Sequence, residues 1–95
     1  MATTSATASS EADIWDRVIQ PERSNLSPDA ARYILDLSFD PRDRKRMHQL
    51  ALKAQAGTLT EQEATELDNY RRVGRLLDLM QSKARLSLKR AGAPH

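Results

Sequence analysis

Apolar residues in the last third of the chain recur at alternating steps of three and four, which is the period of an α-helix. The pattern predicts one helix over residues 61–90, which would be about 45 Å long. A polar residue, Gln81, stands where the stripe would have an apolar one. The stripe consists of Leu67, Tyr70, Gly74, Leu77, Ala84 and Leu88.

Both ends of this predicted helix carry independent boundary signals. Thr60 and Glu63 have the spacing of a capping box, in which each side chain accepts a hydrogen bond from the other residue's backbone amide. At the other end, Lys89 and Arg90 suit the negative end of the helix dipole, and Gly92 supplies the expected left-handed cap. The long helix is therefore specified at both termini.

Two shorter helices are predicted upstream of the long one. A Ser-Pro pair at 27–28 and an Asp-Pro pair at 40–41 each mark a helix start, because the first side chain caps and proline fits the first turn. The apolar periodicity then predicts helices over about 28–37 and 41–56, and no segment favours a strand. We expect an all-α fold whose core comprises Ile34, Leu35, Leu37, Phe39, Met47, Leu50, Leu67, Tyr70 and Leu77.

The region before these helices divides into a tail and an apolar segment. Residues 1–10 are small and polar, which predicts a disordered tail. Residues 11–26 contain Trp15, the largest apolar side chain, and form either a short helical segment or an extended arm. This segment packs on the chain's own helices or on a partner, and residues 27–92 form the helical domain.

The 95-residue length fits one domain, and its composition excludes several classes of protein. The chain has no cysteine, so it has neither a disulfide framework nor a thiolate metal site. It has no stretch that approaches a membrane span, and residues 1–10 lack the features of a secretory signal. We therefore expect a cytoplasmic protein that does not associate with membranes.

Catalytic chemistry finds little support in the sequence. His48 is the only internal histidine, and it follows Arg44, Lys45 and Arg46 without an evident carboxylate partner. No phosphate-binding glycine loop, nucleophile elbow or zinc spacing is present. We expect no catalytic residue, cofactor or metal, and we expect that the protein is not an enzyme.

The apolar surface of the long helix indicates an interface. Two short helices do not have the length to cover all of it, so residues 61–77 are expected to form the scaffold and residues 78–90 an uncovered surface. A second copy of the chain, as in a dimer, or another protein would cover that surface. The expected interface residues are Trp15, Leu76, Leu79, Met80, Lys83 and Leu86.

Nucleic-acid binding is the alternative function. The net charge is only +2, yet basic and acidic residues alternate in blocks along the chain. Basic side chains gather at the start of the second short helix and along the long helix, where several phosphates could be contacted. The candidate contacts are Arg42, Arg44, Lys45, Arg46, Arg71, Arg72, Arg75, Arg85, Lys89 and Arg90.

Three motifs carry a resemblance over residues 34–89. They are an ILDLSF segment, an AGTLTxxExxEL turn and a QSKARLSLK ending. In these motifs the chain resembles a group of small, mostly uncharacterised bacterial all-helical proteins. The resemblance implies genes that lie beside those of HNH-type nucleases, and hence an accessory or antitoxin-like role with a nuclease as partner. It implies no role for any individual residue.

Overall fold

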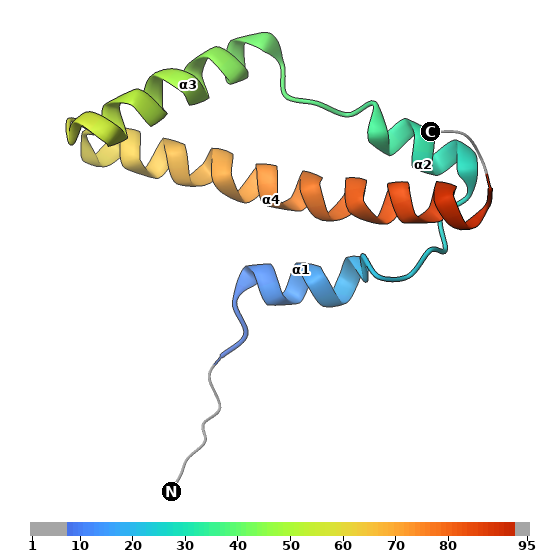
Figure 1. Ribbon diagram of the computed structural model, residues 1–95. Helices are drawn as coiled ribbons and strands as arrows, with labels where there is room; N and C mark the ends of the chain where they lie inside the picture. The colour runs from blue at the N-terminus through green and yellow to red at the C-terminus, as the bar shows by residue number, and fades with distance from the viewer. Residues whose placement is uncertain (1–7, 93–95) are drawn as a thin grey trace, which may run out of the picture.

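The computed structural model describes residues 8–92, and in that range the protein consists of helices with no strand (Figure 1). The all-α prediction is confirmed. The four helices are α1 (Glu11–Ile19), α2 (Pro28–Leu35), α3 (Pro41–Ala56) and α4 (Glu61–Arg90).

The helix boundaries follow the predicted caps closely. Ser10 and Asp13 close a capping box at α1, and Thr60 and Glu63 close the predicted one at α4. Prolines occupy the first turns of α2 and α3 behind their Ser and Asp caps. Helices α3 and α4 have the predicted bounds, because the side-chain caps satisfy the free amides of their first turns.

Helix α2 is shorter than predicted, and residues 11–26, for which two conformations were predicted, contain a helix. Helix α2 ends at Leu35 and not at residue 37, because the Leu37 amide bonds to the Ile34 carbonyl in a tighter turn. Within the segment 11–26, residues 11–19 form a helix, which ends where Gln20 adopts a left-handed conformation (φ 53°). The predicted disordered tail lies mostly at residues 1–7, outside the described residues.

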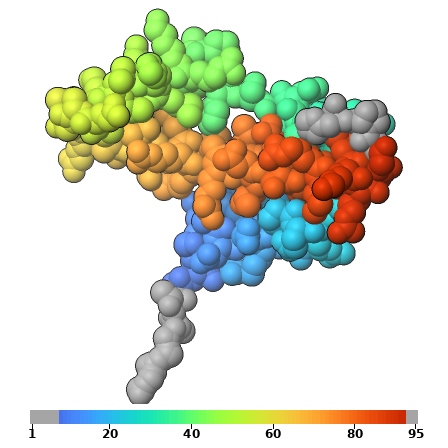
Figure 2. Space-filling model, in the orientation of Figure 1, coloured from blue at the N-terminus to red at the C-terminus, as the bar shows by residue number. Residues whose placement is uncertain are grey.

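Helix α4 is the element against which every other helix packs. Among the described residues, α1, α2 and α3 each contact α4 and make no helix–helix contact with one another. In Figure 1, α3 and α2 follow one another along one side of α4, and α1 lies along the other side. The space-filling view shows the same arrangement, with α1 and the following segment against the C-terminal half of α4 (Figure 2). The positions of the other three helices are therefore set by their contacts with α4.

Few of the described residues are buried, and the one buried cluster lies where α2 meets α4. Ala31, Ala84 and Leu88 form a buried cluster, and partly buried Leu26, Ile34 and Leu35 pack around it. The two alanines let α2 and α4 approach closely. Of the predicted core, Leu50 and Leu67 are buried, and Ile34 and Leu35 are partly buried against the cluster. The other predicted core residues are only partly buried: Leu37, Phe39, Met47, Tyr70 and Leu77.

The division of the long helix into a scaffold and an uncovered half is also wrong. Ala84, Ser87 and Leu88, all in the second half, are among the most buried residues. Val73, in the first half, is 54% exposed. The reason is that α2 packs on the second half of α4, and residues 20–27 cross it between α1 and α2.

Three polar side chains of α4 hold the backbone of the elements around it. Gln81 Nε2 donates to the carbonyl oxygens of Ile34 at 3.2 Å and Leu37 at 2.8 Å, where α2 ends. Lys83 Nζ donates to the carbonyl oxygen of Ile19 at 2.6 Å, the last residue of α1. Each bond supplies a donor to a carbonyl at or just past a helix end, and the Ile34 carbonyl also accepts from the Leu37 amide. Gln81 interrupts the apolar stripe because its side chain caps the C-terminal end of α2.

The third of these side chains acts on the segment between α1 and α2. Ser87 is 2% exposed, and its Oγ accepts a hydrogen bond from the backbone amide of Leu26 at 3.2 Å. A buried amide without such a partner would destabilise the fold. Ser87 therefore fixes the path of this segment across α4.

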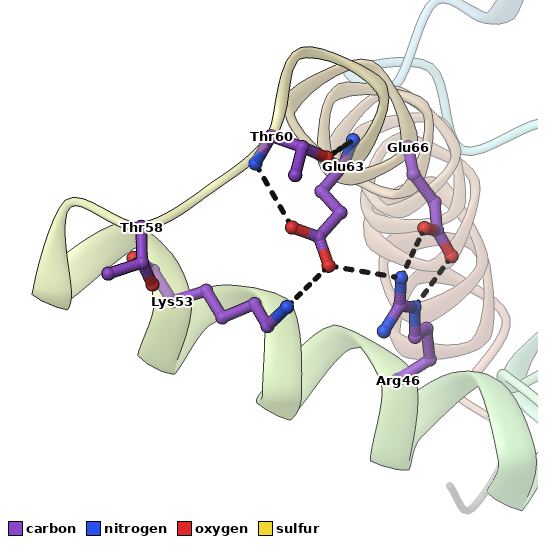
Figure 3. A network of polar contacts seen from close by, with 6 residues as sticks. All are labelled: Arg46, Lys53, Thr58, Thr60, Glu63 and Glu66. Atoms are coloured by element: carbon purple, nitrogen blue, oxygen red, sulfur yellow. Dashed lines mark hydrogen bonds and ion pairs between the residues drawn. The ribbon is translucent and has the colours of Figure 1, made fainter.

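Charged side chains join α3 to the first turns of α4 (Figure 3). Arg46 binds Glu66 through two hydrogen bonds, Nε to Oε2 at 2.9 Å and Nη2 to Oε1 at 2.8 Å. Lys53 Nζ lies 2.6 Å from Oε2 of Glu63, whose Oε1 accepts from the Thr60 amide at 3.0 Å. One carboxylate therefore completes the α4 cap and binds α3.

These contacts shift the titration of the glutamates. The hydrogen bond from Lys53 and that from the Thr60 amide lower the pKa of Glu63 from 4.5 to about 2. The hydrogen bonds from Arg46 likewise lower the pKa of Glu66. Because the folded state favours both ionised carboxylates, their contribution to stability is complete above pH 4.5 and is lost as the pH falls.

Aromatic contacts continue the α3–α4 interface. The rings of Phe39 and Tyr70 meet edge to face with centroids 6.1 Å apart, and the Tyr70 hydroxyl donates to Asp43 Oδ1 at 2.8 Å. The Phe39 ring also lies over Gly74, where an added Cβ would be 3.8 Å from its nearest carbons. That distance is ordinary van der Waals contact, so the ring does not require a glycine at this position.

We predict that Gly74→Ala increases the free energy of unfolding by about 0.5–1 kcal/mol, because alanine favours a helix interior more than glycine. Gly57→Ala is the control, and it should destabilise by about 1 kcal/mol because Gly57 ends α3 at a φ of 70°. Urea unfolding followed by circular dichroism measures both changes. A destabilised Gly74→Ala variant would show that the approach of Phe39 is closer than described.

We predict that Gln81→Leu lowers the free energy of unfolding by about 1–2 kcal/mol, because two carbonyls at the end of α2 lose a donor. The same substitution at Gln62, an exposed residue of α4, serves as control and should have little effect. If both variants unfold at the same urea concentration as the wild type, Gln81 does not hold α2.

We predict that stability falls as the pH is lowered from about 4.5 toward 2, and that Glu63→Gln reduces this dependence. Thermal unfolding at several pH values measures it. Glu61→Gln, in the same turn and exposed, should retain the wild-type dependence. An unchanged pH profile in Glu63→Gln would contradict the assigned role of this carboxylate.

Candidate functional site

An apolar groove runs between α1 and the middle of α4, from Asn69 to Lys83, and it reaches α2 at Ile34. It consists of three adjoining hollows of about 250, 380 and 290 Å³ that all include Trp15, and we call it the Trp15 groove. The apolar side chains that line it include Trp15, Val18, Ile34, Val73, Leu76 and Met80.

Trp15 is held at the surface by its own helix. Its indole Nε1 donates to Oε2 of Glu11, one turn earlier, at 3.3 Å. The side chain is 37% exposed although it is the largest apolar side chain of the protein, and α1 contains no fully buried residue. Trp15 therefore borders the groove and is not enclosed in a core.

Local polar contacts cap the start of α1, and one contact joins its end to α4. At the start, the Ser10 backbone amide donates to Asp13, and this bond lowers the pKa of Asp13. Arg17 Nη2 donates to Ser9 Oγ at 3.0 Å. At the end, Lys83 binds the Ile19 carbonyl. These contacts orient α1 while its apolar side chains stay accessible.

Exposed apolar side chains extend the groove onto the surface. Val18 of α1 is 67% exposed and Val73 of α4 is 54% exposed, and both line hollows that include Trp15. Ile14, one turn before Val18, is 48% exposed. Contiguous exposed apolar surface of this kind is typical of interaction sites.

Most of the expected interface residues meet at this groove. Trp15, Leu76, Met80 and Lys83 line one hollow, and Leu79 lines the adjoining hollow with Trp15 and Leu76. Leu86 lies apart from them. It lines a separate hollow with Pro21, Ser82, Arg85 and others. The groove thus brings five of the six residues together. Their binding of a partner stays a prediction.

Sequence reasoning missed Val18, Ile34 and Val73 as groove residues. Val73 shares a helix side with Leu76 and Met80, at positions i, i+3 and i+7, so the periodicity contained its signal. Ile34 carried no such signal, because it reaches the groove only through the packing of α2 on α4. Val18 follows from the helical conformation of residues 11–19, which the sequence left open.

The ten basic residues proposed for nucleic-acid contact fall into two groups. Arg46 is bound to Glu66 and lies near Glu63, Arg72 lies 3.0 Å from Asp68, and Arg42 lies 3.5 Å from Asp40. The others are exposed and form no ion pair within residues 8–92: Arg44, Lys45, Arg71, Arg75, Arg85, Lys89 and Arg90.

Other kinds of site have little basis in the described part of the chain. No group of three His, Asp or Glu side chains there is arranged to hold a metal ion, and His48 is exposed. None of the four helices has both the length and the apolar character that a membrane span requires. The Trp15 groove is therefore the candidate site.

Comparison with protein-family models, with curated proteins and with solved structures finds no match to this chain.

Proposed function

We propose that this protein is a small helical interaction protein, and that the Trp15 groove is its binding site. The observation that supports the proposal most strongly is the exposure of Trp15, Val18 and Val73 around one apolar groove. Large aromatic side chains that border a pocket commonly anchor protein interfaces. The groove contains few groups that could perform chemistry, which favours binding over catalysis.

A second copy of the chain is the partner that the shape of this surface favours. Ile14 and Val18 lie one turn apart and form an apolar ridge on α1, and the groove lies beside that ridge. Each copy therefore offers both a ridge and a groove. A two-fold symmetric dimer requires such self-complementary surfaces. The nuclease partner suggested by the resemblance stays a prediction that no contact described above tests.

Substitutions at exposed positions test this proposal without removing a buried side chain. We predict that Val18→Lys and Val73→Lys each abolish self-association, because a lysine amine cannot be buried in an apolar interface without a partner. Leu52→Lys on α3 is the matched control, since Leu52 is 52% exposed and lies outside the groove. It should associate like the wild type.

Light scattering after size exclusion, over a range of protein concentrations, measures association. Trp15 is the only tryptophan of the chain, so its fluorescence should shift to shorter wavelength as the groove is covered. A monomer at every concentration with constant fluorescence would contradict self-association. Equal effects of the three lysine substitutions would contradict the assignment of the interface to the groove.

A further inference from the structure

A second open side of α4 is lined by cations. Arg71, Arg75, Arg85 and Lys89 recur at steps that keep them on one side of the helix, and all four are exposed. We call these residues the basic stripe. They border two shallow hollows of about 570 and 500 Å³ that adjoin at Ser82. The helical period places this stripe on the side of α4 opposite Val73 and Met80 of the Trp15 groove, and only Arg75 of the stripe also lines a hollow of that groove.

The cations of the stripe have no ion-pair partner among the described residues, in contrast to several cations at the contacts of α3 and α4. Arg46, Lys53 and Arg72 are each bound by a carboxylate within 3.0 Å. The four cations of the stripe form no ion pair within residues 8–92, although Asp78 lies between its two halves, Glu22 lies at its end and Asp13 of α1 is near Arg75. The stripe therefore keeps a local excess of positive charge.

The spacing arranges this charge in two pairs. Arg71 and Arg75 are one turn apart, as are Arg85 and Lys89, which places the members of each pair about 5–6 Å apart. The two pairs are separated by ten residues, or about 15 Å along the helix. Asp78 lies between them. Two pairs of cations spaced along one helix complement a partner whose negative charges repeat at intervals along its length.

We propose that the basic stripe binds the phosphate backbone of duplex nucleic acid. Three of its four cations are arginines, whose planar guanidinium binds phosphate oxygens through paired hydrogen bonds. An acidic protein helix would also need apolar anchors, and the stripe offers only the half-buried Leu79 and Leu86 beside it. A single strand would need aromatic side chains for base stacking, and the stripe contains none.

Fluorescence anisotropy with a labelled DNA duplex, measured with the full chain over a series of salt concentrations, tests the proposal. Four phosphate contacts predict that the logarithm of the binding constant falls with the logarithm of salt with a slope of about −3.6. Removing two contacts in Arg85→Gln/Lys89→Gln should reduce that slope to about −1.8 and weaken binding at low salt at least tenfold.

Arg44→Gln/Lys45→Gln is the matched control, because it removes two exposed cations of α3 that lie outside the stripe. It should leave the slope unchanged, and circular dichroism should show that both double variants stay folded. Absence of duplex binding at low salt, or equal losses in the two double variants, would overturn the proposal. So would equal or tighter binding of poly-glutamate or of single-stranded DNA, which would assign the stripe to those partners. Loss of self-association in Val18→Lys leaves this result unaffected.

Discussion

The fold depends on one constraint, which is that α4 provides the packing surface for every other described helix. Helices α1, α2 and α3 contact α4 and not one another. The fully buried residues are few, so apolar burial alone gives little specificity. Gln81, Lys83 and Ser87 supply it, because each bonds to a backbone group at a defined point of another segment. Position along α4 is thus set by hydrogen bonds as much as by packing.

The same constraint explains why the protein has two open surfaces. Helices α2 and α3 lie along one side of α4 and α1 along another (Figure 1). Two further sides of α4 carry exposed residues, Val73 on one and the basic stripe on the other. One of these carries Val73, Leu76 and Met80 beside Trp15, and the other carries the basic stripe. The two surfaces therefore differ in chemistry, one apolar and one basic.

Much of the fold could be predicted from the sequence because its helix ends are specified locally. Thr60 with Glu63, and Pro28 and Pro41 behind their caps, act within one turn, so neighbouring residues suffice to identify them. The location of the core could not be predicted in this way. Ala31 and Ala84 become buried because α2 packs on the second half of α4, and small side chains give no signal of that contact in the sequence.

Individual residues of the candidate site could be predicted from the sequence, but their arrangement around one groove could not. Periodicity identified Leu76 and Met80 as apolar positions on α4, and size alone marked Trp15. Their meeting depends on the bond between Lys83 and the end of α1. Lys83 was expected at the interface, and its contact with a backbone carbonyl of α1 follows only from the three-dimensional arrangement.

Residue-resolved NMR over a dilution series tests the central claim most directly, because it shows which residues sense association. Self-association through the Trp15 groove predicts concentration-dependent amide shifts in α1 and around Val73, Leu76 and Met80, with Leu52 of α3 unchanged. Shifts confined to α3, or spectra that do not change with concentration, would contradict it.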